Sequence, residues 1–177
     1  MATMNLDLML SKVVDWVKYA EAKNAVLVVF DSSLLIALLS LVADKQNTFL
    51  IPCWYIIISI VLLIVSAALS LFSFMPILKI VHFNNTNKTD GLNLFHFGDI
   101  AQINAETYID LLKIRYGFDC CSEIDKDLAN QILVNSRVAV YKLRIFRIAL
   151  WLTLSVFLSP LVLLVLVYWE VRKFNDT

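Results

Sequence analysis

"NAVLVVFDSSLLIALLSLVA", residues 24–43, is a stretch of the chain in which Asp31 is the only charged side chain. A helix rises about 1.5 Å per residue, so this stretch is long enough to cross the roughly 30 Å hydrocarbon core of a bilayer. Two other apolar runs are equally long, which predicts three membrane spans at Ala25–Ala43, Leu50–Met75 and Ile148–Trp169. The chain therefore reads as an integral membrane protein.

The composition supports the same class. Hydrophobic residues make up 60% of the 177 residues and charged residues 17%, whereas soluble domains are nearer half and a quarter. Only three glycines and three prolines supply turns, which favours long helices over strands. The net charge of zero gives no overall field to attract nucleic acid, so we expect no readout of duplex DNA. The predicted fold class is all-α, an integral membrane helical bundle.

The distribution of lysine and arginine predicts the orientation of the spans. Basic residues precede the first span and crowd the segment between the second and third, whereas the first loop holds only Lys45. The positive-inside rule then places the N-terminus and this insert in the cytoplasm and the C-terminus outside a bacterial inner membrane. The expected organisation is an amphipathic helix at 1–23, a transmembrane hairpin at 24–76, a cytoplasmic helical insert at 77–144, a third span at 145–170 and an external tail at 171–177.

Helices outside the membrane are also predicted. Residues Leu6–Ala20 place their apolar side chains on one helical face, typical of an amphipathic helix at the membrane surface or on the insert. A short helix is expected to begin at Asn104 or Ala105. Ser122 and Asp125 resemble a capping box that starts a second helix, and no glycine or proline interrupts it before Pro160. The insert is thus expected to end in a stiff, stalk-like helix continuous with the third span.

Residues suited to catalysis or metal binding are few. The chain lacks the common nucleophile, zinc-protease and phosphate-loop motifs. Its three cysteines, Cys53, Cys120 and Cys121, have no metal-ligand spacing, and the two histidines stand beside no carboxylate cluster. We therefore expect neither an enzyme nor a metal or cofactor site.

Polar residues within the spans are the first candidates for function. Asp31 lies about 9 Å beyond Ala25, where a charge costs roughly 2.5–3.5 kcal/mol. Either neighbouring helices shelter Asp31 by hydrogen bonding, or water in a conduction pathway reaches it. Hydroxyl residues form a second set, which allows close helix packing or gives a pore a wettable wall: Ser32 and Ser33 in the first span, and Ser59, Ser66, Ser70 and Ser73 on one face of the second.

Basic residues of the insert are the second set of candidates. They are Arg115 in the short helix and Arg137, Lys142, Arg144 and Arg147 in the stalk. Side chains of this kind commonly extend toward lipid headgroups. Repeated around an oligomer, they would instead form a cationic ring that binds a phosphate-rich ligand.

Three segments, in this order and spacing, resemble the Pycsar effector transmembrane family. They are "EAKNAVLVVFDSSLL" at Glu21–Leu35, "NLFHFGDIAQINAETYIDLL" at Asn93–Leu112 and "DLANQILVNSRVAVYKLRIFRIAL" at Asp127–Leu150. The resemblance covers about Glu21 to Trp169. It implies a membrane effector of bacterial anti-phage defence that impairs the inner membrane and arrests growth.

The resemblance also implies a nucleotide or oligonucleotide signal made by a partner nucleotidyltransferase or cyclase. Three spans per chain are few to enclose a pathway, so we expect a homo-oligomer, with a tetramer favoured, that forms a regulated pore. The alternative is a membrane-anchored adapter or scaffold whose spans serve only as anchors.

Overall fold

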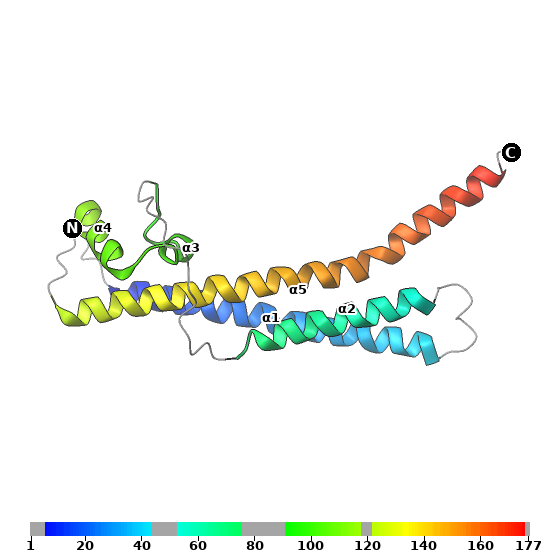
Figure 1. Ribbon diagram of the computed structural model, residues 1–177, viewed down its shortest axis with the longest axis horizontal. Coiled ribbons are helices and arrows are strands. Elements are labelled where there is room, and N and C mark those ends of the chain that lie inside the picture. The colour runs from blue at the N-terminus through cyan, green and yellow to red at the C-terminus, as the bar shows by residue number, and fades with distance from the viewer. Residues whose placement is uncertain (1–5, 44–52, 76–90, 118–121, 176–177) are drawn as a thin grey trace. The chain divides into compact units, whose positions relative to one another are not determined.

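A computed structural model describes residues 6–43, 53–75, 91–117 and 122–175 (Figure 1). Lys45, Cys120 and Cys121 lie outside these ranges. The described chain forms five helices and no strand: α1 at Leu6–Ala43, α2 at Cys53–Phe72, α3 at Phe97–Ile100, α4 at Ala105–Tyr116 and α5 at Glu123–Asn175. Three of them, α1, α2 and α5, are long and apolar enough to cross a membrane. The predicted all-α membrane fold class is confirmed.

The residues divide into two compact units. The first, here called the insert unit, comprises Met1–Lys23 and Phe74–Arg144. The second, the span unit, comprises Asn24–Ser73 and Ile145–Thr177. Helices α1 and α5 each contribute one part to either unit.

Helix α1 contains, in one helix from Leu6 to Ala43, both the amphipathic segment predicted at Leu6–Ala20 and the first predicted span at Ala25–Ala43. The physical reason is that residues 21–24 contain no glycine or proline to end a helix. The buried side chains follow one another at intervals of three, four or seven residues: Leu6, Met9, Val13, Ala20, Asn24, Leu27 and Asp31. This spacing is that of a helix packed in a coiled-coil manner.

The ends of α4 and α5 are capped as the sequence predicts. The Asn104 side chain accepts a hydrogen bond from the Thr107 N–H at 2.7 Å, and Gly117 ends α4 in the left-handed conformation with φ of 63°. Before α5, the Asp125 N–H donates to Ser122 Oγ at 3.2 Å and the Ser122 N–H donates to Asp125 Oδ2 at 3.3 Å. This reciprocal pair is a capping box with aspartate in place of glutamate.

The core of the insert unit joins α1, α4 and α5 with the segment around α3. Its buried residues are Leu6, Met9, Val13, Leu94, Ile100, Ile103, Tyr108, Leu111, Leu112, Ala129 and Ile132. Tyr108 lies at the centre, where its hydroxyl donates to Met9 Sδ at 3.6 Å and to the Leu94 carbonyl at 3.5 Å. Burial raises the pKa of the Tyr108 phenol well above its usual value, with a smaller contribution from Tyr116. The phenol therefore stays neutral and acts as a packing and hydrogen-bonding group.

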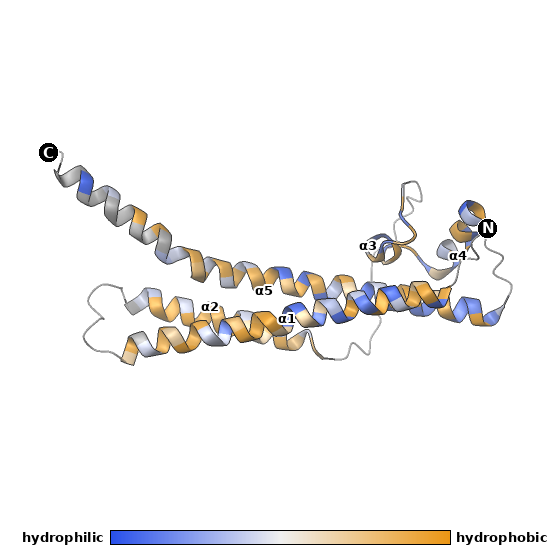
Figure 2. Cartoon of the chain, turned by 180° about the vertical axis from the view of Figure 1, so that it is seen from behind, coloured by the Kyte–Doolittle hydropathy of each residue, from blue (hydrophilic) through white to orange (hydrophobic). Residues whose placement is uncertain are grey.

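The span unit has an apolar outside and a partly polar inside. Many large apolar side chains are exposed on its helices, among them Val26, Ile57 and Trp151, and apolar colouring dominates α2 (Figure 2). Its buried polar residues are Asn24, Asp31, Ser59, Ser66, Ser70, Ser73 and Thr153. Pro160 lies within α5, which bends in its C-terminal part (Figure 1). This distribution suits a bundle in which lipid covers the apolar surface and the helices cover the polar one.

Candidate functional site

Asp31 lies at the centre of a polar cluster to which all three long helices contribute. Thr153 of α5 donates its hydroxyl proton to Asp31 Oδ1 of α1 at 2.6 Å. Ser66 of α2 places its Oγ 2.9 Å from Thr153 Oγ1 and 3.0 Å from the Ala149 carbonyl oxygen. We call Asp31, Ser66, Thr153 and the Ala149 carbonyl the Asp31 cluster. In this geometry a neighbouring helix shelters Asp31 by hydrogen bonding.

The protons of the Asp31 cluster do not satisfy all of its oxygens. Each hydroxyl carries a single proton. The Thr153 hydroxyl lies closer to Asp31 than to the Ala149 carbonyl, which is 3.2 Å away. Asp31 Oδ2 and the Oγ of Ser70, one helical turn from Ser66, have no hydrogen-bond partner among the residues that the structure describes. A buried polar atom without a hydrogen-bond partner lowers the free energy of unfolding by about 1–3 kcal/mol.

Asp31 is also the only charged residue of the three predicted spans. Residues 25–43, 50–75 and 148–169 contain no lysine, arginine or histidine, and no second carboxylate. The groups that bond to Asp31 or to its partners are hydroxyls and a backbone carbonyl, all of them uncharged. The Asp31 carboxylate is therefore fully buried, and the spans contain no residue of opposite charge to balance it.

The predicted serines separate into two groups. Ser59, Ser66 and Ser70 of α2 and Ser73, which directly follows α2, are buried at intervals of seven, four and three residues, so they share one inward face. Ser32 and Ser33 are instead exposed, and their hydroxyls donate to the Val28 and Val29 carbonyls of their own helix at 2.8 and 2.9 Å. Their polarity is satisfied within α1, because successive residues of a helix point about 100° apart and cannot all face inward with Asp31.

Two further polar contacts, one buried and one partly buried, join helices of the span unit beyond the Asp31 cluster. The Asn24 side-chain amide donates to Ser73 Oγ at 3.1 Å, and the Tyr55 hydroxyl lies 2.5 Å from Ser159 Oγ. Sequence reasoning passed over Asn24, Thr153 and Ser159 as site residues. The only feature of the sequence that could have pointed to Thr153 is a hydroxyl inside a span, four residues from the small residue Ala149. This pattern is equally typical of residues that only pack helices together.

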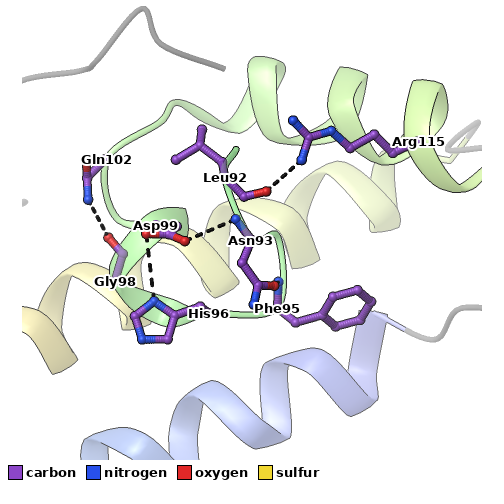
Figure 3. Close-up of polar contacts among 8 residues, drawn as sticks. All are labelled: Leu92, Asn93, Phe95, His96, Gly98, Asp99, Gln102 and Arg115. Atoms are coloured by element: carbon purple, nitrogen blue, oxygen red, sulfur yellow. Dashed lines mark hydrogen bonds and ion pairs between the residues drawn. The ribbon is translucent and has the colours of Figure 1, made fainter. Parts of the chain in front are cut away.

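A second polar constellation lies in the insert unit, in residues 92–103, which we call the elbow (Figure 3). The Asn93 N–H donates to Asp99 Oδ2 at 3.0 Å, and His96 Nδ1 lies 3.8 Å from Asp99 Oδ1. Gly98 leaves room for the His96 ring, because a Cβ at this position would lie 2.7 Å from His96 Cε1 and the ring would have to shift. Arg115 of α4 closes the elbow by donating to the Leu92 carbonyl at 2.6 Å.

Arg137 of α5 holds the other end of the elbow. Its Nε donates to the Ala101 carbonyl at 3.2 Å and its Nη2 to the Ile103 carbonyl at 3.0 Å. Partial burial lowers the pKa of the Arg137 guanidinium below its ordinary value. The two-pronged contact uses the planar fork of arginine, which a lysine cannot reproduce.

The other predicted basic residues have different surroundings. Lys142 of α5 is buried and forms an ion pair with Glu21 of α1 at 2.5 Å. Arg144 and Arg147 are exposed. Arg115, Arg137 and Lys142 thus bond to groups of the insert unit itself, and the cationic ring that would bind a ligand stays a prediction. Among the described residues, no three metal-ligating side chains gather at one place.

Comparison with known proteins identifies the family. A profile of the Pycsar effector protein domain matches residues 5–169. The chain belongs to the Pycsar effector family. It is similar to the Pycsar effector protein RsPycTM of a Rhizobium species, with 30% identity over 171 residues that cover 93% of this chain and 97% of that protein. No solved structure matches the chain.

Membership confirms the resemblance read from the three quoted segments and makes the protein a membrane effector of anti-phage defence. The matched region contains α1, α2, α3, α4 and most of α5. Both the Asp31 cluster and the elbow therefore lie within the family domain.

Proposed function

We propose that this Pycsar effector forms a homo-oligomeric ion channel or membrane-disrupting pore that a nucleotide signal regulates. Its action would arrest growth or kill the cell, and it would need no catalysis. The observation that carries the proposal is the inward polar face of the span unit, where Asp31, Ser66 and Thr153 meet. A bundle that served only as an anchor has no use for a carboxylate at this depth, which is costly to bury.

The buried position of these residues corresponds to a closed state. Water can reach Asp31 and the α2 serines only when α1, α2 and α5 separate or rotate, because the three helices cover them. The signal would act by stabilising the open arrangement over the closed one, as a shift between two populated states. The closed bundle is held by few polar contacts, which suits a reversible transition.

The insert unit would receive the signal. The positive-inside rule places it in the cytoplasm of a bacterial cell, where a partner nucleotidyltransferase or cyclase would release its product. Arg137 and Arg115 hold the elbow to α5 and α4 through backbone carbonyls. A phosphate that competed for either guanidinium would release these carbonyls and change how the elbow packs on α5.

A stripe along α5 supports assembly. Its positions alternate in steps of three and four residues and hold four apolar or aromatic residues and two polar ones: Ile124, Asp127, Gln131, Val134, Val138 and Tyr141. Ile124 is 71% exposed, and Val134 and Tyr141 are each 39% exposed. This face lies away from the buried one formed by Ala129, Ile132, Ser136 and Ala139. Copies inserted in one membrane in the same orientation would pair in parallel along it, and four copies is the size that we favour.

Ion flux through purified protein in liposomes tests the proposal. Wild type should release ions when a panel of cyclic mononucleotides and oligonucleotides is added, and Asp31→Asn should change the flux or its ion dependence. Ser32→Ala is the matched control, because Ser32 is exposed and bonds to its own helix. We expect Ser32→Ala to behave as wild type.

The rival function is a membrane adapter whose insert unit recruits a partner without ion flux. An exposed apolar side chain of the insert unit outside the α5 stripe, Ile114 at 80% exposed, favours this rival. Oligomeric, folded protein that stays silent with every nucleotide of the panel would support the adapter and overturn the pore.

A further inference from the structure

The Asp31 carboxyl group lacks a partner of opposite charge, and this lack has a chemical consequence. It is 0% exposed, lies within a span and is the only charged group that the spans contain. An isolated ion is not kept in such surroundings without compensation. We propose that the Asp31 cluster is a binding site for one small monovalent cation, a proton or a sodium ion, inside each protomer.

The donor atoms of the cluster are all oxygens. Asp31 supplies the carboxylate, Ser66 and Thr153 supply hydroxyl oxygens, and Ala149 supplies a backbone carbonyl, with 2.6 to 3.2 Å between neighbouring atoms. Oxygen ligands of this kind suit hard cations rather than the softer transition metals. A single carboxylate balances one positive charge, so the site fits a monovalent cation better than a divalent one.

The free oxygen of Asp31 gives the cation a place to bind. Oδ1 accepts from Thr153, whereas Oδ2 is buried and has no partner among the residues that the structure describes. Ser70, one turn along α2 from Ser66, has a second buried oxygen in the same condition. The unpartnered carboxylate oxygen of Asp31 distinguishes this place from an ordinary packing stripe of serines.

The surroundings also identify Asp31 as the group that responds to the cation. Thr153 on α5 bonds to Asp31 and Ser66 on α2 bonds to Thr153, and neither side chain is charged in the physiological range. Asp31 is therefore the one charged group of the cluster that a bound cation would neutralise.

The two cations would leave different hydrogen bonds. A proton on Oδ2 preserves the bond from Thr153 to Oδ1. A sodium ion needs the lone pairs of Thr153 and Ser66, so both hydroxyls would have to turn their protons away from the site. The inference deepens the proposed pore by naming what occupies its polar centre, but occupancy can be measured without any flux.

A hydrophobic carbodiimide measures this occupancy. Dicyclohexylcarbodiimide adds across the O–H of a protonated carboxyl group and rearranges to a stable N-acylurea that retains every atom of both reactants. Full-length protein in detergent would be treated from about pH 5 to about pH 9 in choline chloride, and the Asp31 peptide analysed by mass spectrometry. Asp31→Asn is the control, and the same series is repeated with sodium chloride.

We expect the adduct on Asp31 in wild type and none at this position in Asp31→Asn. Labelling that is insensitive to sodium means that a proton fills the site, whether or not it slows with rising pH. Labelling that sodium slows about tenfold or more means that sodium competes for it. Thr153→Val should raise the sodium concentration needed for this protection.

Thermal unfolding gives a second measurement. If no adduct forms in either salt, a sodium site is still detected when sodium raises the Tm of wild type relative to choline, but not that of Asp31→Asn. Absence of both the adduct and the sodium-dependent difference in Tm would overturn the proposal. A pore that conducts in liposomes despite this result would show that the cation site fails while the proposed function stands.

Discussion

Thr153 of α5 and Asp31 of α1 lie 2.6 Å apart, oxygen to oxygen, in a hydrogen bond buried within the span unit. The distance is at the short end for an O–H···O bond. Lipid offers no polar group that could replace either partner. The contact between α1 and α5 at this depth therefore depends on one hydroxyl proton.

Thr153→Val tests this dependence, because it keeps the shape of the side chain and removes the hydroxyl. It leaves Asp31 without its donor, so we expect the free energy of unfolding to fall by about 1–3 kcal/mol. Denaturant unfolding in detergent, followed by helical circular dichroism, measures the change. Ser155→Ala is the control, because Ser155 is exposed and bonds to the Trp151 carbonyl of its own helix at 2.7 Å. An equal loss in both variants would show that the Asp31 contact has no special role.

Much of the fold follows from local patterns in the sequence. The spans follow from uninterrupted apolar runs, and the caps at Asn104 and Ser122 follow from side chains that bond within three residues. The inward serines of α2 follow from their spacing. Each of these features depends on residues close in the chain, so one sequence is enough to predict them.

Other features depend on residues far apart and could not be predicted. Thr153 and Asp31 are 122 residues apart, and several hydroxyl residues of the spans were equal candidates for the partner. Arg137 bonds to two backbone carbonyls of the elbow, which carry no side-chain signature. The sequence predicted a helix at Leu6–Ala20 and a span at Ala25–Ala43 but not that one helix contains both, because a change from polar to apolar composition does not itself end a helix.

The ion pair between Glu21 and Lys142 predicts an asymmetric response to mutation. The Lys142 side chain is 5% exposed and that of Glu21 is 40% exposed. Glu21→Gln leaves a buried ammonium group without its carboxylate and should cost about 2–4 kcal/mol, whereas Lys142→Met leaves a carboxylate that water can reach and should cost about 1 kcal/mol or less.

Unfolding of both single variants and of the double variant measures the coupling between Glu21 and Lys142. The double variant should be more stable than Glu21→Gln alone, because it removes the uncompensated charge. Additive losses would show that the two side chains do not interact.

Arg137→Lys should loosen the elbow without unfolding the insert unit. A lysine can reach one of the Ala101 and Ile103 carbonyls but cannot hold both in a fixed fork. Hydrogen exchange of peptides covering residues 97–107 should become faster, while peptides of α2 keep their rates. Arg144→Lys is the control at an exposed position of the same helix. Equal exchange in both variants would contradict a positioning role for Arg137.

Substitution of Arg137 together with Lys142 tests whether these side chains bind the ligand or only stabilise the insert unit. Combined substitution of Arg137 and Lys142 should weaken nucleotide binding if either side chain contacts phosphate in the activated state. Titration of a nucleotide panel by isothermal calorimetry measures the affinity. Unchanged affinity for every nucleotide that binds wild type would remove both residues from the predicted ligand site and leave Arg144 and Arg147.

Val134→Glu tests the proposed contact between copies along α5. Val134 is 39% exposed in one protomer, so a glutamate is tolerated there, but parallel copies would bring like charges together in the apolar part of the stripe, beside Val138 and Tyr141. We expect the mass of the detergent-solubilised assembly, measured by light scattering, to fall toward that of one protomer. Lys12→Glu, at an exposed position of α1, adds a carboxylate away from the stripe and should leave the mass unchanged.

In a protein whose native cysteines are replaced, Val134→Cys should cross-link between copies and Lys12→Cys should not. An assembly that keeps its mass in Val134→Glu and fails to cross-link through Val134→Cys would mean that another surface joins the copies.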